Sequence, residues 1–221
     1  MKKTRGFILI LCCLLMLGAL AACPVQAAAT YKNELVKVKI KGSSPKDYNY
    51  YYYNKKGKKL KNTWKKVKVK GKTRKFYFGK NGKAYKAEKD ASFKYNVAVK
   101  KIKGTKYGFD TNGYLVNGLY VSAGFGTGKM YYFSKTGKLN ASVTAALQKA
   151  AKQGADSAVL RRLMKKYAGK PKKTYTTDVC TTFEGVEPLS ATVDQYGSFE
   201  VQYFLMPDDR EVVYMVAGAL R

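Results

Sequence analysis

The sequence predicts a mainly β protein with an α+β end: an N-terminal array of stacked, solenoid-like β-hairpins, then two helices packed on an antiparallel sheet. Three observations predict it. An aromatic phrase ending in glycine recurs four times between residues 51 and 137, and such a period marks a repeat protein. Residues 141–170 have apolar side chains at helical spacing, and residues 173–221 alternate between apolar and polar. The predicted domains are therefore 28–140 and 141–221.

Each aromatic phrase predicts a strand followed by a turn. Aromatic residues at alternate positions suit a pleated strand, and glycine accepts the positive φ of a tight turn. The four phrases are 51–57, 76–82, 107–113 and 131–137, ending at Gly57, Gly82, Gly113 and Gly137. A second candidate strand precedes each of them, at 36–40, 64–69, 96–102 and 119–123. One hairpin is marginal alone, so we expect stacked neighbours to complete its core.

The C-terminal part predicts two helices and a meander. Asn140 or Ser142 can cap a first helix that runs to about Gln153. A second helix, from about Asp156 to Tyr167, carries its apolar side chains on one face. Its polar face and last turns hold Arg161, Arg162, Lys165 and Lys166. The expected strands are 174–181, 190–195, 198–206 and 211–217.

Residues 1–27 predict a signal peptide, because a charged start precedes an apolar run of 14 residues that is too short to span a bilayer. Two cleavage sites overlap. Cleavage after Ala27 fits ordinary signal peptidase, whereas the segment from Leu20 to Cys23 resembles a bacterial lipobox. The latter would make residues 1–22 a lipoprotein signal and Cys23 a lipidated membrane anchor. Both alternatives predict an exported protein at the cell envelope, bound to the wall or anchored in the membrane.

The charge is concentrated in the repeats. The formal net charge is +29, and residues 30–110 carry 26 Lys and Arg against 5 Asp and Glu, whereas residues 174–221 carry 2 against 8. A field of this strength attracts polyanions such as nucleic acid, anionic lipid or an anionic wall polymer. Lysine greatly outnumbers arginine, which favours a wall polymer over nucleic acid, because bidentate recognition of bases and phosphates uses arginine.

The residue types argue against an enzyme. The chain has no histidine, which excludes His-based acid–base catalysis and Ser-His triads. Cys180 has no cysteine partner once the signal is removed, and we expect it to be a small buried side chain without a metal. Carboxylates cluster only in predicted turns, at Glu184 and Glu187 and at 208–211. We therefore predict a non-enzymatic protein without a metal or another cofactor.

Two phrases resemble a known repeat family. Residues 64–84, from Trp64-Lys65-Lys66-Val67 to Gly82-Lys83-Ala84, and residues 128–139 resemble the choline-binding or cell-wall-binding repeat of Gram-positive surface proteins. The likeness extends over residues 36–140 and implies one hairpin per repeat, a β-solenoid and a wall polymer as ligand. The units around Tyr51, Tyr107 and Tyr131 lack the tryptophans of choline sites. The resemblance therefore implies an anionic wall polymer, teichoic-acid-like or peptidoglycan, rather than choline.

The candidate ligand-binding residues follow from the lysines and rings of these units. The predicted phosphate-binding lysines are Lys65, Lys66, Lys68, Lys70 and Lys72. The aromatic residues expected to stack on sugars or to build the repeat core are Trp64, Tyr77, Phe78, Tyr107, Tyr131 and Tyr132. The predicted function is thus binding of an anionic wall glycopolymer at the cell surface.

The C-terminal part resembles a second group of proteins. The segments Gly169-Lys170-Pro171, Cys180, Glu184-Gly185, 199–203 and 212–214 are similar to those of small exported domains of the β-lactamase-inhibitor-like class. This resemblance implies an exported protein partner for residues 141–221. Two alternative functions stay open: extracellular nucleic-acid binding by the basic repeats, and protein inhibition through the C-terminal domain.

Overall fold

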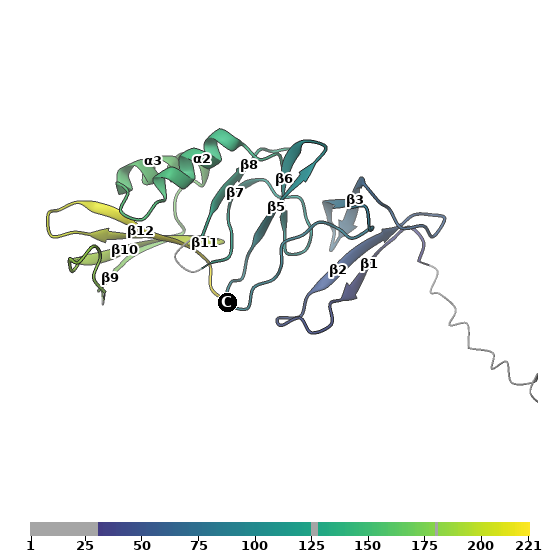
Figure 1. The fold of residues 1–221 in the computed structure, drawn as a ribbon, viewed down its shortest axis with the longest axis horizontal. Helices are drawn as coiled ribbons and strands as arrows, with labels where there is room; N and C mark the ends of the chain where they lie inside the picture. Colours follow the sequence, from purple (N-terminus) through teal and green to yellow (C-terminus); the bar gives the residue numbers. More distant parts are fainter. Residues whose placement is uncertain (1–30, 125–127, 180) are drawn as a thin grey trace, which may run out of the picture. The chain divides into compact units, whose positions relative to one another are not determined.

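The computed structural model describes residues 31–124, 128–179 and 181–221, and residues 32–221 form one compact unit. Four two-stranded antiparallel hairpins are followed by two helices and a four-stranded antiparallel sheet, which confirms the predicted fold class (Figure 1). The predicted signal segment with Cys23, and Cys180, lie outside the described residues. No helix within the described residues is long and apolar enough to cross a membrane.

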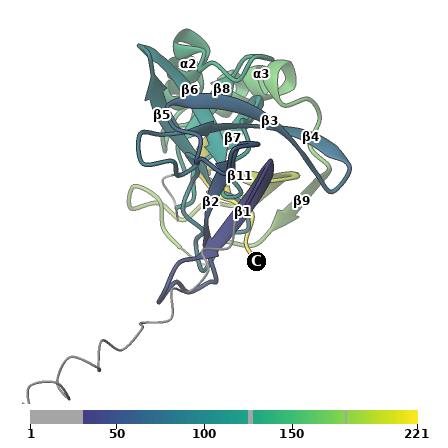
Figure 2. The ribbon, with the colours of Figure 1, turned by 90° about the vertical axis from the view of Figure 1, so that its right-hand side faces the viewer.

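Each hairpin consists of two strands in which apolar or aromatic residues alternate with polar ones, joined by a turn that contains glycine. The pairs are β1 (Glu34–Lys39) with β2 (Tyr48–Tyr53), β3 (Thr63–Val69) with β4 (Lys72–Phe78), β5 (Val97–Ile102) with β6 (Thr105–Asp110), and β7 (Gly118–Val121) with β8 (Met130–Phe133). The turn between β3 and β4 has positive φ at both Lys70 (46°) and Gly71 (76°), as a two-residue hairpin turn requires. In Figure 2, hairpin β3–β4 runs across the direction of β1–β2.

A third segment, which the sequence patterns do not predict, completes each unit. After the glycine turn the chain folds back and bridges its own second strand. The four bridges are Tyr53–Lys59, Phe78–Ala84, Phe109–Leu115 and Phe133–Leu139. The same segment also binds the preceding hairpin: the amides of Ala84, Leu115 and Leu139 donate to the carbonyls of Tyr50, Lys75 and Lys106 at 2.8–2.9 Å. Backbone hydrogen bonds therefore join successive units.

The repeated glycine serves both the turn and the stacking. Gly137 has φ of 79°, which L side chains rarely adopt. A Cβ on Gly137 would also lie 2.6 Å from the side chain of Leu115, which belongs to the previous unit. Gly113 repeats the arrangement, since its Cβ would lie 3.1 Å from the carbonyl oxygen of Tyr85. Glycine at the end of each phrase therefore allows one unit to approach the next.

Aromatic side chains fill the spaces between units. Phe76 and Phe78 are fully buried and pack with Tyr52 between the first and second hairpins. Phe109 is equally buried between the second and third hairpins, where Trp64 packs against it. The alternation of rings along each phrase thus places one face in an inter-unit core.

The C-terminal part combines α2 (Ala141–Ala150), α3 (Ser157–Tyr167) and a sheet in the order β12–β11–β10–β9. The strands are β9 (Lys173–Thr177), β10 (Ser190–Tyr196), β11 (Phe199–Leu205) and β12 (Glu211–Gly218). Asn140 caps α2 by accepting from the amide of Val143 at 3.1 Å. The helix ends three residues before the predicted Gln153, and β9 ends at Thr177 rather than at residue 181.

The fourth hairpin shares a core with the helices and the sheet. Met130 of β8 is fully buried and clusters with Leu147 of α2, Met164 of α3 and Val201 of β11. The amide of Gly128 donates to the carbonyl of Val216 in β12 at 3.1 Å. One continuous core therefore crosses residue 140.

Candidate functional site

The most cationic segment is hairpin β3–β4, which we call the lysine hairpin (residues 63–78). It carries seven cations and no carboxylate: Lys65, Lys66, Lys68, Lys70, Lys72, Arg74 and Lys75. Lys66, Lys68, Lys70 and Lys72 are exposed. Alternation along β3 places Lys66 and Lys68 on the same face, about 7 Å apart, because two strand residues span about that length. Lys70 lies in the turn, and Lys72 pairs with Val69 and so belongs to the other face, which means that exposed ammonium groups occur on both faces and at the tip of the hairpin.

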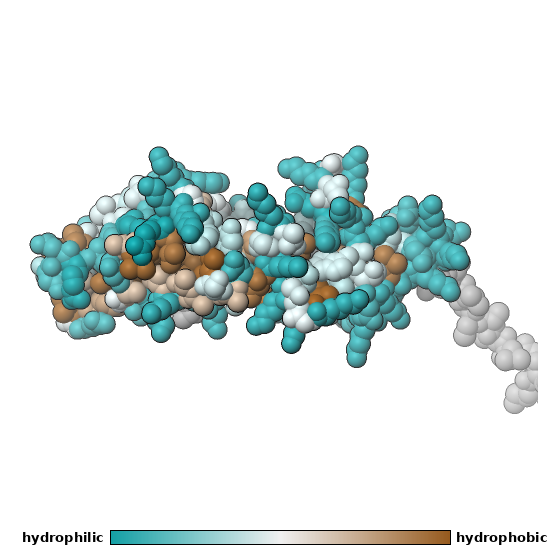
Figure 3. Space-filling model, turned by 90° about the horizontal axis from the view of Figure 1, so that it is seen from above, coloured by the Kyte–Doolittle hydropathy of each residue, from teal (hydrophilic) through white to brown (hydrophobic). Residues whose placement is uncertain are grey.

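These cations form no ion pair within the part of the chain that the structure describes, although Arg74 is near enough to Asp110 to lower the pKa of that carboxyl. The ion pair that the described array contains joins Lys86 to Asp47, outside the lysine hairpin. None of the seven hairpin cations forms an ion pair with a described carboxylate. In the space-filling view, hydrophilic side chains project from the hairpin array (Figure 3). Unpaired like charges gathered on one segment raise its local positive potential.

The third hairpin also carries exposed lysines, which are absent from the candidate residues predicted from the sequence. Lys100, Lys101, Lys103 and Lys106 of β5–β6 and its turn are all exposed. Asp110 closes this hairpin, and its Oδ1 accepts the amides of Asn112 and Tyr114, at 2.9 Å each. Burial raises the pKa of Asp110, and this effect is larger than that of the two hydrogen bonds, which lower the pKa. The sequence contains a pattern that could have identified these lysines: a Lys-Gly turn between two lysine-bearing strands occurs at 103–104, as it does at 70–71.

Trp64 lies inside an aromatic cluster between the second and third units. Its ring centroid is 5.1 Å from that of Tyr77, 5.0 Å from that of Tyr107 and 5.9 Å from that of Phe109. Tyr77 is 7% exposed and Phe78 is fully buried. Of the two roles expected for these rings, the structure places Tyr77 and Phe78 in the repeat core.

The protein's own ammonium groups cover several of the remaining ring faces. Lys75 Nζ lies 4.5 Å from the ring centre of Trp64, and Lys65 Nζ lies 4.8 Å from that of Tyr52. Such contacts are attractive because the ring face carries negative charge density. Lys65 is therefore directed at the first hairpin, unlike the exposed Lys66 and Lys68 of the same strand.

Tyr131 and Tyr132 belong to the fourth hairpin and point to opposite faces of β8. Tyr131 packs on Phe133 with a centroid distance of 6.4 Å. Tyr132 packs on Tyr167 of α3 at 4.9 Å. The structure does not bring either ring to the lysine hairpin.

The acidic end contains a partly buried ionic network. Arg161 Nη1 donates to Asp194 at 2.6 Å, and its Nε and Nη2 donate to Glu211 at 3.0 and 2.9 Å. The guanidinium also lies 3.9 Å from the ring centre of Tyr203. Arg161, expected on the polar face of its helix, is thus half-buried against the sheet by these contacts. Glu211, the first residue of the expected strand 211–217, is half-buried and not the solvated charge that was expected, whereas Asp208 is an exposed turn residue as expected.

Hydrogen bonds set the ionisation of Glu211. Burial would raise its pKa, but hydrogen bonds from Arg161 and from Ser157, at 2.5 Å, hold the pKa below its ordinary value. Asp194, 3% exposed, also accepts from the hydroxyl of Thr174 at 2.7 Å. This saturated network stabilises the packing of α3 on the sheet. The described residues contain no cluster of His, Cys, Asp or Glu that could hold a metal ion.

The fold and this surface define a β-hairpin repeat protein with a strongly cationic array joined to a small α+β part. No family model and no curated protein matches the chain. Two solved structures of the modular autolysin LytC from Streptococcus pneumoniae, one in complex with a synthetic peptidoglycan ligand, are similar to 50% of the chain at 17% identity, with TM-scores of 0.21 and 0.17. The match covers 33% of the autolysin. At this level of similarity the function has to be argued from the site itself.

Proposed function

We propose that this is an exported, non-enzymatic surface protein whose hairpin array binds an anionic, phosphate-bearing glycopolymer of the cell wall. The observation that carries the proposal is the lysine hairpin, which has seven cations, no carboxylate and no ion pair with a described carboxylate. The next hairpin, β5–β6, adds four further exposed lysines.

A polymer suits this surface better than a single small anion. An exposed ammonium–phosphate contact is weak, at about 0–1 kcal/mol, so one contact would not give useful affinity. Lysines that recur along two hairpins can meet several phosphates of one chain, and each further contact is then intramolecular. Lysine is a compact point charge on a flexible stem, which fits phosphates on a flexible backbone.

The arrangement of the rings favours a wall polymer over nucleic acid. Proteins that bind single strands stack bases on open aromatic side chains. Here the ring of Tyr77 is buried, and Trp64 is packed among other rings with Lys75 on its face. Charge is therefore the principal means of recognition at this surface, and aromatic stacking is not.

The proposal is tested by binding of the purified protein to isolated cell walls across a salt series. We expect binding that weakens steeply as salt rises, because screening shortens the range of exposed charges. Walls stripped of teichoic acid should bind much less, and a soluble phosphate-bearing wall polymer should compete better than DNA. Equal binding to stripped walls would contradict the polymer assignment, and stronger competition by DNA would support the nucleic-acid alternative.

A further inference from the structure

The C-terminal sheet has one covered edge and one open edge. At β12, Val213 forms two backbone hydrogen bonds outside the sheet: its carbonyl accepts from the amide of Gly154, and its amide donates to the carbonyl of Ala155, at 2.8 Å each. On the opposite side of the sheet, β9 pairs with β10 alone (Figure 1). No backbone hydrogen bond among the described residues reaches the outer side of β9. The sheet is therefore open at β9 in this part of the chain.

The outer side of β9 presents backbone donors and acceptors. In an antiparallel ladder, every second residue turns its amide and carbonyl away from the partner strand. Four of the five side chains of β9 are exposed, and threonine and tyrosine favour an extended backbone. The residues that discourage edge pairing, Pro171 and Lys173, stand before the strand and at its first position, and Thr174–Thr177 carry no charge. Such an edge can accept a further strand.

A cleft of about 280 Å³ lies at the start of this edge, between α3 and the sheet. Its lining includes Lys165 of α3, Lys170 and Thr174 of β9. Thr174 belongs to the face of the sheet that α3 covers, because its hydroxyl donates to Asp194, the partner of Arg161. A side chain on the same face of a strand added to β9 can therefore reach the cleft.

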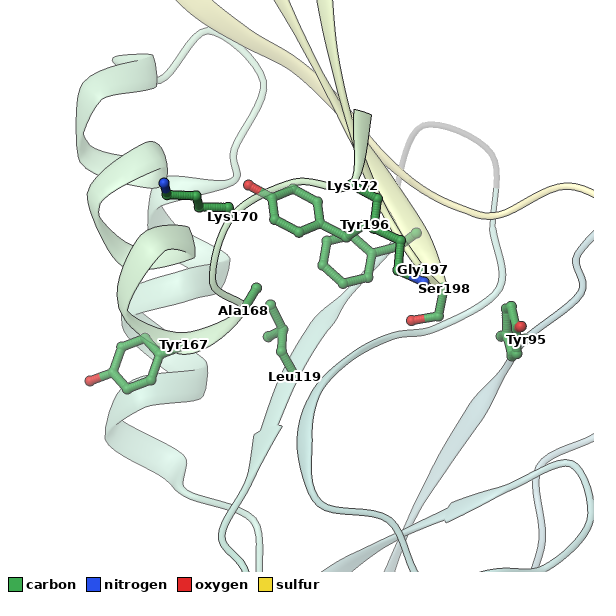
Figure 4. A pocket seen from close by; sticks show the side chains of 10 residues that line it. Tyr95, Leu119, Tyr167, Ala168, Lys170, Lys172, Tyr196, Gly197 and Ser198 are labelled. Carbon is green, nitrogen blue, oxygen red and sulfur yellow. The ribbon is translucent and has the colours of Figure 1, made fainter. Parts of the chain in front are cut away.

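The two lysines that follow α3 take different directions. Figure 4 shows the side chain of Lys170 extending toward α3, whereas Lys172 reaches the β10–β11 turn. The position of Lys170 agrees with its place in the lining of the cleft, together with Lys165. These two lysines give the cleft its free positive charge.

The surroundings of this end of β9 are cationic. The lysines around it are all exposed, and none forms an ion pair with a described carboxylate: Lys165, Lys166, Lys170, Lys172 and Lys173. Asp194 is buried and already accepts from Arg161 and Thr174, and Asp178 follows the other end of the strand. Carboxylates on an added strand would therefore complement the charge at the start of β9. A second copy paired through β9 would instead bring two lysine-bearing ends of α3 together.

We propose that β9 accepts, as an added strand, an extended acidic segment of a partner protein. Backbone hydrogen bonds along the open edge supply affinity, and a carboxylate that enters the cleft between Lys165 and Lys170 supplies specificity. The inference does not rest on the proposed function of the array, because neither the edge nor the cleft contains an array residue.

Amide hydrogen exchange of the purified protein tests this edge, with and without a capped peptide in which glutamate alternates with threonine. We expect slower exchange in β9, because its outward amides gain acceptors. A peptide of the same sequence that is N-methylated at every amide keeps the charge but cannot pair with the edge, so it should not protect β9. The array also attracts anionic peptides, so the variant with Lys66, Lys68, Lys70 and Lys72 replaced by Gln is included and should keep the protection of β9.

The cleft is tested by two double variants of equal charge. Lys165→Gln combined with Lys170→Gln should weaken the peptide about tenfold, as the loss of two exposed charge contacts implies. Lys149→Gln combined with Lys152→Gln removes two exposed lysines from α2 and the turn after it, and should leave the affinity nearly unchanged.

Four results would overturn the inference. Equal protection of β9 by the N-methylated peptide would reduce the effect to charge alone. Protection confined to the hairpins, or lost in the lysine-hairpin variant, would place the peptide on the array. Slower exchange in β9 at higher protein concentration without peptide would assign the edge to a second copy. Equal losses in the two double variants would leave no role for the cleft.

Discussion

The ammonium of Lys75 lies 4.5 Å from the ring centre of Trp64, on the neighbouring strand of the same hairpin. Trp64 is the only tryptophan of the chain, and its ring also meets Tyr77 and Tyr107. An aromatic ring that already holds a lysine is poorly suited to a second cation. At this position the ring is packed among other rings and one of its faces is covered by a cation of the same hairpin.

We predict that choline does not change the fluorescence of Trp64 in the millimolar range, because Lys75 occupies the ring face. Lys75→Ala should uncover this face and make Trp64 more accessible to a neutral quencher. Lys66→Ala, which removes the same charge from the position opposite Lys75, is the control and should leave quenching unchanged. A saturable response of the unaltered protein to choline would contradict this account of the aromatic cluster.

Stacking of the units should depend on glycine at the end of each phrase. Gly137→Ala should destabilise the protein by roughly 2–4 kcal/mol, because it combines a positive φ with overpacking against Leu115. Gly104→Ala has the same positive φ but open space around the new Cβ, and about 1 kcal/mol is expected. Urea unfolding measures both, and equal losses would argue that the contact with Leu115 is unimportant.

Arg161 should be the main electrostatic contributor to the C-terminal fold. Arg161→Met keeps much of the apolar stem but leaves the buried Asp194 without its cation, and roughly 3 kcal/mol should be lost. Arg162→Met, at an exposed position of the same helix, is the control and should change stability little. Thermal unfolding compares the two variants, and similar melting temperatures would count against the network.

Acid should weaken the fold partly through Glu211. Its pKa is lowered in the folded state, so its stabilising contribution is complete above the unfolded pKa and is lost as pH falls through the folded pKa. Glu211→Gln should therefore make the free energy of unfolding less dependent on pH on the acid side. The exposed Glu187→Gln variant serves for comparison, and an unaltered pH profile in Glu211→Gln would refute the assignment.

The core that crosses residue 140 should couple the fourth hairpin to the helices. Met130→Ala should cost roughly 2–5 kcal/mol and should speed amide exchange in β8. Met206→Ala removes an almost equally buried methionine from a separate cluster that contains no array residue. Exchange in β8 that responds equally to both substitutions would argue against a specific coupling through Met130.

The hairpins could be predicted because each carries its own local signal. Alternating rings and a terminal glycine fix the strand and the turn, and the expected strands lie within a few residues of those observed. The third segment of each unit could not be predicted, because a single bridging residue such as Leu115 has no period of its own. The amide of Leu115 donates to the carbonyl of Lys75 in the previous unit, which is a contact distant in sequence.

The candidate surface could be predicted in part, because the alternation of side chains along a strand is also a local signal. Alternation along β3 predicts that Lys66 and Lys68 share a face, and both are exposed, as are Lys70 of the turn and Lys72 of β4. Which lysines turn toward rings depends on the neighbouring unit, so the contact of Lys65 with Tyr52 was not foreseen. Likewise, the inward position of Arg161 depends on carboxylates 33 and 50 residues away.

The central claim is tested most directly by wall binding of two variants with equal net charge. One replaces the exposed lysines of the hairpin, Lys66, Lys68, Lys70 and Lys72, by Gln. The other replaces four exposed lysines of the helical part, Lys149, Lys152, Lys165 and Lys166, by Gln. We predict that the first variant loses roughly 30-fold or more in affinity for teichoic-acid-bearing walls, as four weak charge contacts imply, and that the second loses little. Equal losses in both variants, or none in the first, would contradict the claim.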